Sequence, residues 1–238
     1  MNQYIISAKN IKKKYGGKTV FCNASLNVKR GEIYGLIGKN GSGKTTLLRI
    51  LAGLIKDYNG EVLISDNISG CKSKISAVIN TPSLFLNMSA FHNMKEQAIL
   101  SGIRDEGRIE QALSTVGLSE CGSNDVKSFS LGMMQRLKLA MALLESPDIL
   151  ILDEPSNGLD PDGISELRLL LLDLNRTYGI TILISSHILS ELENVASCIG
   201  ILQSGEIVKE LSMSDILQSG ESLENIYLQY TKGARNNV

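Results

Sequence analysis

The sequence contains no apolar run close to the ~20 residues that a helix needs to cross a bilayer. Its longest candidate, residues 167–174, is interrupted by Arg168 and Asp173. The formal net charge of −1 provides no broad basic field for nucleic acid or for an anionic membrane surface. The first residues lack the apolar core and the cleavage site of a signal peptide. These absences indicate a soluble cytosolic protein with no nucleic-acid partner.

Cysteine is scarce and scattered. The cysteines stand singly, without the spacing of metal ligands, at Cys22, Cys71, Cys121 and Cys198. In a chain without an export signal we expect these thiols to be reduced.

Strand-like runs and helical periodicity alternate along the chain. Three β-like runs precede a helix expected from Lys44, and two more follow it. Residues 89–145 are predicted to be helical almost throughout. After Pro147, strand and helix alternate, and a hairpin-like pair surrounds Gly205. Strands that alternate with helices predict a parallel α/β sheet covered on both faces.

The chain is long enough for one large domain with ample core. No repeat, low-complexity segment or long linker divides it. We therefore expect a single domain over residues 1–238, with a helical subdomain at about 85–145 and a short C-terminal extension at about 211–238.

The segment GLIGKNGSGKTT places Gly38, Gly43, Lys44 and Thr45 in the pattern G-x-x-x-x-G-K-T. It follows a strand-like run and precedes a helix, which is the context that this pattern requires. Glycines let backbone N–H groups turn inward around phosphates, Lys44 can reach the β- and γ-phosphate oxygens, and Thr45 can ligate Mg²⁺. The alternative, a glycine-rich turn with a surface lysine, is disfavoured by the flanking strand and helix.

The segment ILILDEP brings two carboxylates to the end of an apolar run. Asp153 is expected to hold Mg²⁺ through its water shell, and Glu154 to orient or deprotonate an attacking water. By pattern alone, an acidic pair at a strand end can equally be a solvated turn. Its position downstream of a phosphate loop in the same α/β domain favours the catalytic interpretation.

His187 stands where a strand-like run gives way to a helix. Its strand follows the one that ends near Glu154, so the two side chains are candidates to be neighbours. Ligands gather at the carboxyl ends of parallel strands. We therefore interpret His187 as a γ-phosphate sensor rather than as a structural histidine.

Tyr15, in KKKYGG, precedes the predicted phosphate loop. It can be an exposed turn aromatic or a flat ring that stacks on adenine, and the spacing alone does not decide between them. The basic residues 12–14 before it are interpreted as a solvated strand edge.

A long amphipathic helix is predicted over residues 131–145, with Ser130 as its N-cap. Apolar side chains recur at helical spacing, and Arg136 and Lys138 lie off that stripe. Gly132 would leave the backbone N–H groups of the first turn uncovered, and a bare helix N-terminus favours an anion. The residues alone do not say which anion.

These segments together resemble an ATP-binding cassette (ABC) domain over nearly the whole chain. GKNGSGKT resembles the Walker A segment, ILILDE the Walker B segment with its catalytic glutamate, and SNGLD the D-loop. FSLGM stands where Leu-Ser-Gly-Gly-Gln is usual, His187 matches the switch histidine, and Tyr15 falls where the adenine-stacking aromatic lies. The resemblance implies an α/β P-loop NTPase fold: a RecA-like core with a parallel sheet, an N-terminal antiparallel β subdomain and a helical signature subdomain.

The resemblance also implies ATP and Mg²⁺ as ligands. The catalytic residues expected from it are Lys44, Glu154 and His187. The metal-binding residues expected from it are Thr45, Asp153 and Asn80. The nucleotide-binding residues expected from it are Tyr15, Gly38, Asn40, Gly41, Ser42, Gly43, Lys44, Thr45, Thr46, Ser130, Gly132 and Asp160.

In the family, the residues equivalent to Ser130 and Gly132 grip the γ-phosphate of ATP held by a facing subunit. The resemblance therefore implies a head-to-tail pair with a second nucleotide-binding domain, most simply a homodimer. Two positions depart from the family pattern. Leu131 replaces the first signature glycine; its side chain can point away into the core, so we expect function to survive. Asn80 replaces a glutamine or glutamate and is shorter, so a water bridge to Mg²⁺ is expected there.

Further segments, among them GITILISSHILSELE and SLENIYLQYT, are similar to ATP-binding subunits of bacterial exporters for bacitracin resistance or lanthipeptide self-immunity. This similarity implies an ATP-hydrolysing subunit on the cytoplasmic side of the cell membrane, driving separate integral membrane permease subunits. Residues 80–94 and the following helices are expected to dock that partner. The alternative is a soluble cassette ATPase acting on nucleic acid or ribosomes, against which stand the missing basic stripe and coiled-coil insertion.

Overall fold

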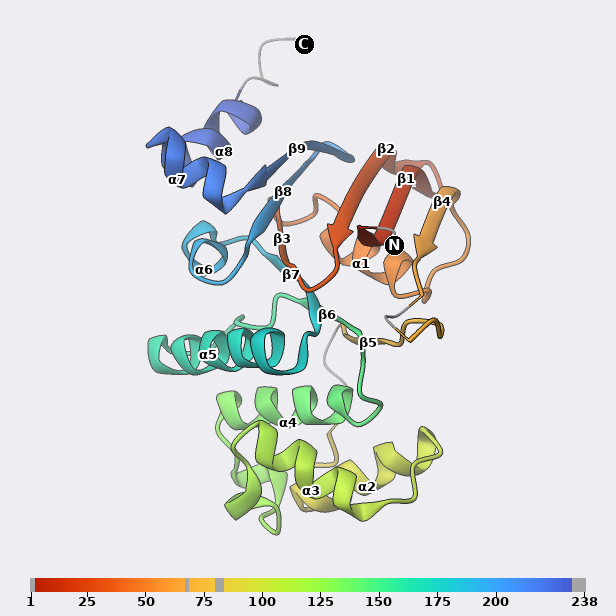
Figure 1. The fold of residues 1–238 in the computed structure, drawn as a ribbon, viewed down its shortest axis with the longest axis vertical. Helices are drawn as coiled ribbons and strands as arrows, with labels where there is room; N and C mark the ends of the chain where they lie inside the picture. Colours follow the sequence, from red (N-terminus) through yellow and green to blue (C-terminus); the bar gives the residue numbers. More distant parts are fainter. Residues whose placement is uncertain (1–2, 67–68, 80–83, 233–238) are drawn as a thin grey trace.

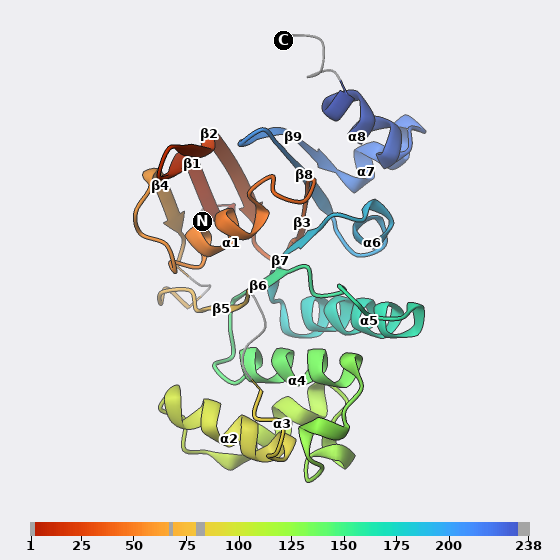
Figure 2. The same cartoon turned by 180° about the vertical axis from the view of Figure 1, so that it is seen from behind.

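Six strands form the central sheet, in the order β5-β6-β7-β3-β8-β9 (Figures 1 and 2). The computed structural model describes residues 3–66, 69–79 and 84–232. The strands of this sheet are β3 (Ile33–Ile37), β5 (Ile75–Val78), β6 (Ile149–Asp153), β7 (Thr181–Ser186), β8 (Cys198–Gln203) and β9 (Glu206–Ser212). Neighbours are parallel except β8 and β9, which form an antiparallel hairpin. The predicted parallel sheet and the hairpin around Gly205 are confirmed.

Parallel pairing brings the carboxyl ends of β3, β6 and β7 to one edge of the sheet. These strands are almost continuously buried, as expected where helices or other strands cover both faces. In the register, Ile37 pairs with Ser186 and Asp153 pairs with Ser185. The loop after Ile37, the acidic pair and His187 therefore leave the sheet at neighbouring points.

A second, antiparallel sheet has the order β2-β1-β4. Its strands are β1 (Tyr4–Tyr15), β2 (Lys18–Lys29) and β4 (Asn59–Ile64). Lys13 lies within β1 and is only 5% exposed, and its Nζ lies 3.0 Å from Asp57 Oδ2. The prediction of a solvated edge over residues 12–14 is therefore wrong at Lys13, because alternate side chains of a strand face opposite sides.

The helical part of the chain is confirmed between residues 89 and 145. Its elements are α2 (Ala90–Leu100), α3 (Glu106–Thr115), two short 3₁₀ turns η1 (Ser119–Cys121) and η2 (Val126–Ser128), and α4 (Leu131–Leu143). Ser89 and Asp105 cap α2 and α3 by accepting hydrogen bonds from backbone N–H groups of the first turn. Both views place these helices together, on the far side of the central sheet from β1, β2 and β4 (Figures 1 and 2).

The remaining helices are α1 (Lys44–Leu51), α5 (Pro161–Tyr178), α6 (Leu189–Glu193), α7 (Met213–Ser219) and α8 (Leu223–Lys232). The last two helices follow β9 and make up most of the predicted C-terminal extension, whose limits stay a prediction. Within the described parts of the chain, no helix combines the length and apolar composition that crossing a membrane requires.

Two hydrophobic cores lie on opposite faces of the central sheet. Ile149 and Ile151 of β6 face the α1-side core, which also contains the inner side chains of α1, β1 and β2. Leu150 and Leu152 face the α5-side core, shared with α5 and the helical subdomain. This alternation follows from the two-residue period of a strand. Strand β6 is thus packed on both faces, which fixes the position of Asp153 at its end.

Candidate functional site

The loop between β3 and α1 is shaped by glycines. A side chain at Gly38 would place its Cβ 2.6 Å from Ser42 Oγ and 2.7 Å from the carbonyl oxygen of Leu202. Gly43, with φ of 107°, occupies a conformation that other residues rarely adopt, and it leads directly into α1. The loop therefore curls tightly against the end of β3, as a phosphate cradle requires.

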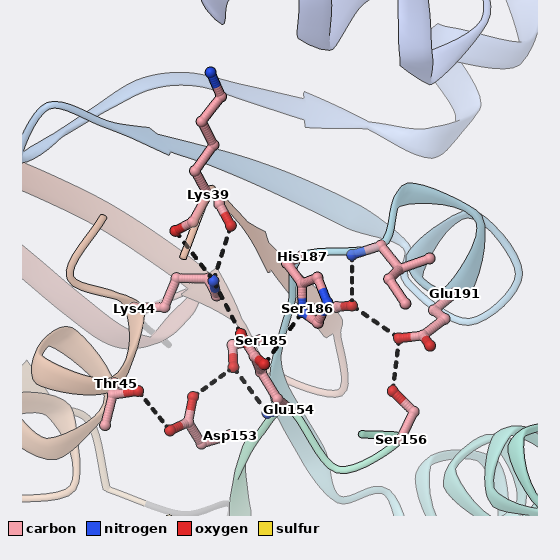
Figure 3. Close-up of polar contacts among 12 residues, drawn as sticks. Lys39, Lys44, Thr45, Asp153, Glu154, Ser156, Ser185, Ser186, His187 and Glu191 are labelled. Atoms are coloured by element: carbon pink, nitrogen blue, oxygen red, sulfur yellow. Dashed lines mark hydrogen bonds and ion pairs between the residues drawn. The ribbon is translucent and has the colours of Figure 1, made fainter. Parts of the chain in front are cut away.

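Lys44 connects this loop to the end of β6. It is 5% exposed, and its Nζ donates to the carbonyl oxygen of Gly38 at 2.8 Å and lies 3.0 Å from Glu154 Oε1 (Figure 3). A weaker bond of 3.4 Å reaches the carbonyl oxygen of Lys39. The ammonium is thus fixed between the loop and the acidic pair, where it can meet a terminal phosphate.

Thr45 and Asp153 meet across the gap between α1 and β6. Thr45 Oγ1 donates to Asp153 Oδ2 at 2.6 Å, and Ser185 Oγ donates to Asp153 Oδ1 at 2.7 Å (Figure 3). A hydroxyl and a carboxylate are oxygen ligands of the kind that Mg²⁺ prefers, usually together with water and substrate phosphates. The donor set therefore fits a magnesium ion beside the phosphate loop.

Glu154 adopts a backbone conformation that is unusual for a residue with a side chain. Its φ is 47°, and its N–H donates to Ser185 Oγ at 3.0 Å and to the Ser185 carbonyl at 3.2 Å. This turn swings the carboxylate toward Lys44 and toward His187, whose Nδ1 lies 3.1 Å from Glu154 Oε2. Strain held in this way is typical of functional sites, because the surrounding bonds must over-determine the conformation.

Glu191 connects the segments beside Glu154 and His187 through hydrogen bonds. Its Oε2 accepts hydrogen bonds from Ser156 Oγ at 2.6 Å and from Ser186 Oγ at 2.8 Å (Figure 3). Ser156 lies two residues after Glu154, and Ser186 directly precedes His187. Glu191, Ser185 and Ser186 are missed by the sequence analysis; the only signal is their closeness in sequence to His187.

A cavity of about 890 Å³ opens over these groups, within the size range of small-molecule sites. It is lined by ten of the predicted site residues: Tyr15, Asn40, Gly41, Ser42, Gly43, Lys44, Thr45, Thr46, Asp153 and Glu154. Ser42 Oγ is buried and has no hydrogen-bond partner among the residues that the structure describes, as expected for a hydroxyl that donates to a phosphate oxygen when nucleotide binds. Tyr15 is about half exposed, and Lys13 Nζ lies 4.7 Å from the centre of its ring.

At the start of α4, the predicted anion-site residues Ser130 and Gly132 do not line this cavity, although Leu131 between them does. Ser130 caps the helix by accepting a hydrogen bond from Met133 N at 3.2 Å, and Gly132 leaves the first turn open. Asp160, which caps α5 through Gly163 N, is also exposed and away from the cavity lining. These residues can therefore meet a ligand that approaches from outside the chain.

Leu131 and Asn80 are the two positions that depart from the family pattern. Leu131 is 43% exposed, and its Cδ2 lies 3.0 Å from the position that a Cβ on Gly158 would take. Leu131 therefore does not point into the core: it lies on the surface beside the D-loop segment and lines the cavity. Asn80 falls outside the described residues.

Comparison with known proteins identifies the chain. A family model described as "ABC transporter" matches residues 21–157, more than half of the sequence. The chain is an ATP-binding cassette of the ABC transporter family. A second model, described as "AAA domain, putative AbiEii toxin, Type IV TA system", matches residues 122–193.

Curated relatives extend this match over nearly the whole cassette. This chain is 41% identical over 219 residues to the bacitracin transport ATP-binding protein BcrA of Enterococcus faecalis, and the match covers 90% of this chain and 71% of BcrA. It is also 41% identical over 225 residues to the lantibiotic transport ATP-binding protein SrtF of Streptococcus pyogenes, covering 94% of this chain and 96% of SrtF.

Solved structures agree with the fold. A dimeric ATP-binding cassette in a post-hydrolysis state, bound to ADP and Pi, has a TM-score of 0.75 at 28% identity, covering 87% of this chain and 98% of the other. A nucleotide-free ATP-binding cassette from an ABC transporter has a TM-score of 0.81 at 21% identity, covering 95% and 98%. The protein is thus a P-loop NTPase and an ATP hydrolase, the ATP-binding subunit of a transporter.

Proposed function

We propose that this cassette hydrolyses Mg-ATP at the edge where β3, β6 and β7 end. Lys44 and the loop N–H groups bind the β- and γ-phosphates, and Ser42 Oγ donates to a phosphate oxygen. Thr45 and Asp153 would hold Mg²⁺, which neutralises phosphate charge. The observation that supports this assignment is the convergence of Lys44, Thr45, Asp153 and Glu154 from two elements onto one cavity.

Glu154 orients and deprotonates the attacking water in this proposal, and His187 holds the γ-phosphate side of the site. The 3.1 Å contact between His187 Nδ1 and Glu154 Oε2 supports a shared role, because one side chain orients the other. Ser185 fixes the Glu154 backbone and the Asp153 carboxylate at the same time. Catalysis then rests mainly on positioning and charge stabilisation.

A second copy of the cassette completes each site. Ser130 and Gly132 lie at an open helix N-terminus and are not among the residues that line their own cavity, so they are suited to the γ-phosphate held by a facing copy. The dimeric relative with ADP and Pi supports such a pair. Glu154→Gln should trap the closed pair in Mg-ATP; a monomer at high concentration would contradict self-pairing.

The cassette drives export of a peptide antibiotic from the cytoplasmic side of the membrane. The names of BcrA and SrtF, at 41% identity, support this cargo class. The membrane partner docks on the helical subdomain, where large apolar side chains are exposed at Phe85, Leu86, Ile99 and Leu100. The segment of the membrane protein that docks there would bury apolar surface that is otherwise exposed to water.

Growth of the native host in bacitracin and in a lantibiotic tests this proposal. A strain that lacks the gene is complemented with the wild type, with Glu154→Gln, or with Glu193→Gln, an exposed residue of α6 that serves as the control. We expect only the wild type and the control to restore resistance. A tagged pull-down from membranes should also recover a multi-span membrane protein. Ribosomes in its place, with unchanged resistance, would contradict the export role.

A further inference from the structure

Lys138 is a buried lysine on α4 that forms no ion pair within the described part of the chain. It is 7% exposed, although the helical periodicity places it off the apolar stripe. Among the residues that the structure describes, no carboxylate lies within ion-pair distance of its Nζ, and Gln135 Oε1 at 3.5 Å is its one hydrogen-bond partner. A buried charge without a partner is costly, so Lys138 requires an explanation.

The nearby carboxylates are already engaged. Asp153 accepts hydrogen bonds from Thr45 and Ser185, and Glu154 contacts Lys44 and His187. Neither is left to neutralise Lys138. Burial lowers the pKa of the Lys138 ammonium, as expected where the charged form lacks compensation.

Lys138 lines the nucleotide cavity together with two residues of the same helix. Leu131, Gln135 and Lys138 are spaced i, i+4 and i+7 and therefore share one face of α4. A lysine that only fills space would extend its ammonium to bulk water. Lys138 is instead buried, it lines the cavity that Lys44 and Glu154 also line, and its Nζ lies 3.5 Å from Oε1 of Gln135, another lining residue.

The position of α4 indicates which part of ATP lies near Lys138. The helix packs against β5, the neighbour of β6, and Val78 at the end of β5 lines the same cavity. Tyr15, the candidate adenine platform, belongs to the antiparallel sheet on the far side of the central sheet from α4 (Figure 1). Lys138 and Tyr15 thus belong to elements on opposite sides of the central sheet, which favours the phosphates rather than the base as the partner of Lys138.

Building on the proposed function, we propose that Lys138 is a second cation for the terminal phosphate of ATP, contributed by the helical subdomain of the same chain. Lys44 binds from the core and Lys138 from α4, so a γ-phosphate joins the two parts of the molecule. ADP lacks the group that reaches Lys138. The residue consequently makes the cassette prefer ATP over ADP.

Calorimetric titration with ATP and with ADP, in EDTA so that no hydrolysis occurs, tests this role. Lys138→Met should weaken ATP binding about tenfold, as expected for loss of a charge-assisted hydrogen bond, and change ADP binding less than twofold. Lys138→Arg keeps the charge and should retain the ATP preference. Lys127→Met, an exposed lysine paired with Asp125 at 2.9 Å, is the control and should change neither affinity.

Thermal unfolding separates this role from a structural one. Lys138→Met removes an uncompensated charge, so it should unfold at the same or a higher temperature while its ATP preference falls. Equal weakening of ATP and ADP, or unchanged affinities, would overturn the inference; if the Met variant does not fold, Lys138→Gln replaces it. Lys44→Ala tests the site itself: if it binds both nucleotides like the wild type, the proposed function fails as well.

Discussion

The hydrogen bonds of Glu191 predict that this residue controls turnover without touching ATP. In Glu191→Ala, the hydroxyls of Ser156 and Ser186 lose their common acceptor, which lies 2.6 and 2.8 Å away. Ser186 is only 2% exposed, so its hydroxyl has little access to water as a substitute partner. Both the stability of the fold and the position of His187 should respond.

The size of the effect follows from the type of bond. A hydrogen bond to a charged group contributes about 1.5–3 kcal/mol, and a partner that can reach water recovers part of that loss. The bond to the buried Ser186 hydroxyl therefore accounts for about 2 kcal/mol, and the bond to the half-buried Ser156 for about 1 kcal/mol. We expect Glu191→Ala to lower the free energy of unfolding by about 3 kcal/mol. Glu191→Gln keeps an acceptor oxygen and should cost about 1 kcal/mol.

Catalysis should fall more than binding. In the proposed mechanism, loosening the segments beside Glu154 and His187 displaces the groups that orient water, and a displacement of about 1 Å can cost on the order of 100-fold in rate. We expect kcat to fall by about 10- to 100-fold, with KM for ATP within about twofold because Lys44 and the loop are untouched.

Urea unfolding followed by circular dichroism, together with steady-state ATPase kinetics, measures both effects. Glu193→Ala, an exposed carboxylate on the same helix, is the matched control and should resemble the wild type. If Glu191→Ala loses stability but keeps its kcat, the link does not position the active side chains. Wild-type stability would refute the energies assigned to the two bonds.

Three further predictions concern other parts of the molecule. Gly200→Ala should lower the free energy of unfolding by about 3 kcal/mol in urea, because its Cβ would lie 2.0 Å from Tyr34 Oη. Burial raises the pKa of the Cys198 thiol to about 12, so at pH ~8 iodoacetamide should label it about 10³-fold more slowly than an ordinary cysteine, as peptide mapping would show. The free energy of unfolding of Lys138→Met should exceed that of the wild type by less as pH rises from the lowered pKa of Lys138 toward 10.5. In this range the folded wild type has released the buried proton that the unfolded chain still binds, so the wild type gains stability with pH. Urea unfolding at a series of pH values measures the difference.

The parts of the site that belong to local patterns could be predicted from the sequence. The glycine-rich loop, the acidic end of β6 and the helix cap at Ser130 each depend on residues close in the chain, so their elements are where the sequence places them. The alternation of strands and helices likewise predicts the parallel sheet, since such strands need crossover helices. The roles of these residues in catalysis stay predictions.

Features set by tertiary packing could not be predicted in this way. Lys13 and Lys138 are buried because neighbouring elements cover them, which periodicity along one strand or helix does not reveal. Leu131 faces the segment at Gly158, a contact between residues far apart in the chain. Glu191 has an ordinary helical position, and only the folded chain brings it to both serines.

The separation of the two cores bears on how such chains can diverge. Substitutions that refit the helical subdomain to another membrane protein are accommodated in the α5-side core, whereas the side chains beneath α1 belong to the α1-side core. A lineage can therefore change its membrane partner and keep its ATP chemistry. The central strands β3, β6 and β7, whose residues alternate between both cores, are less free to change, because a substitution there disturbs one core or the other.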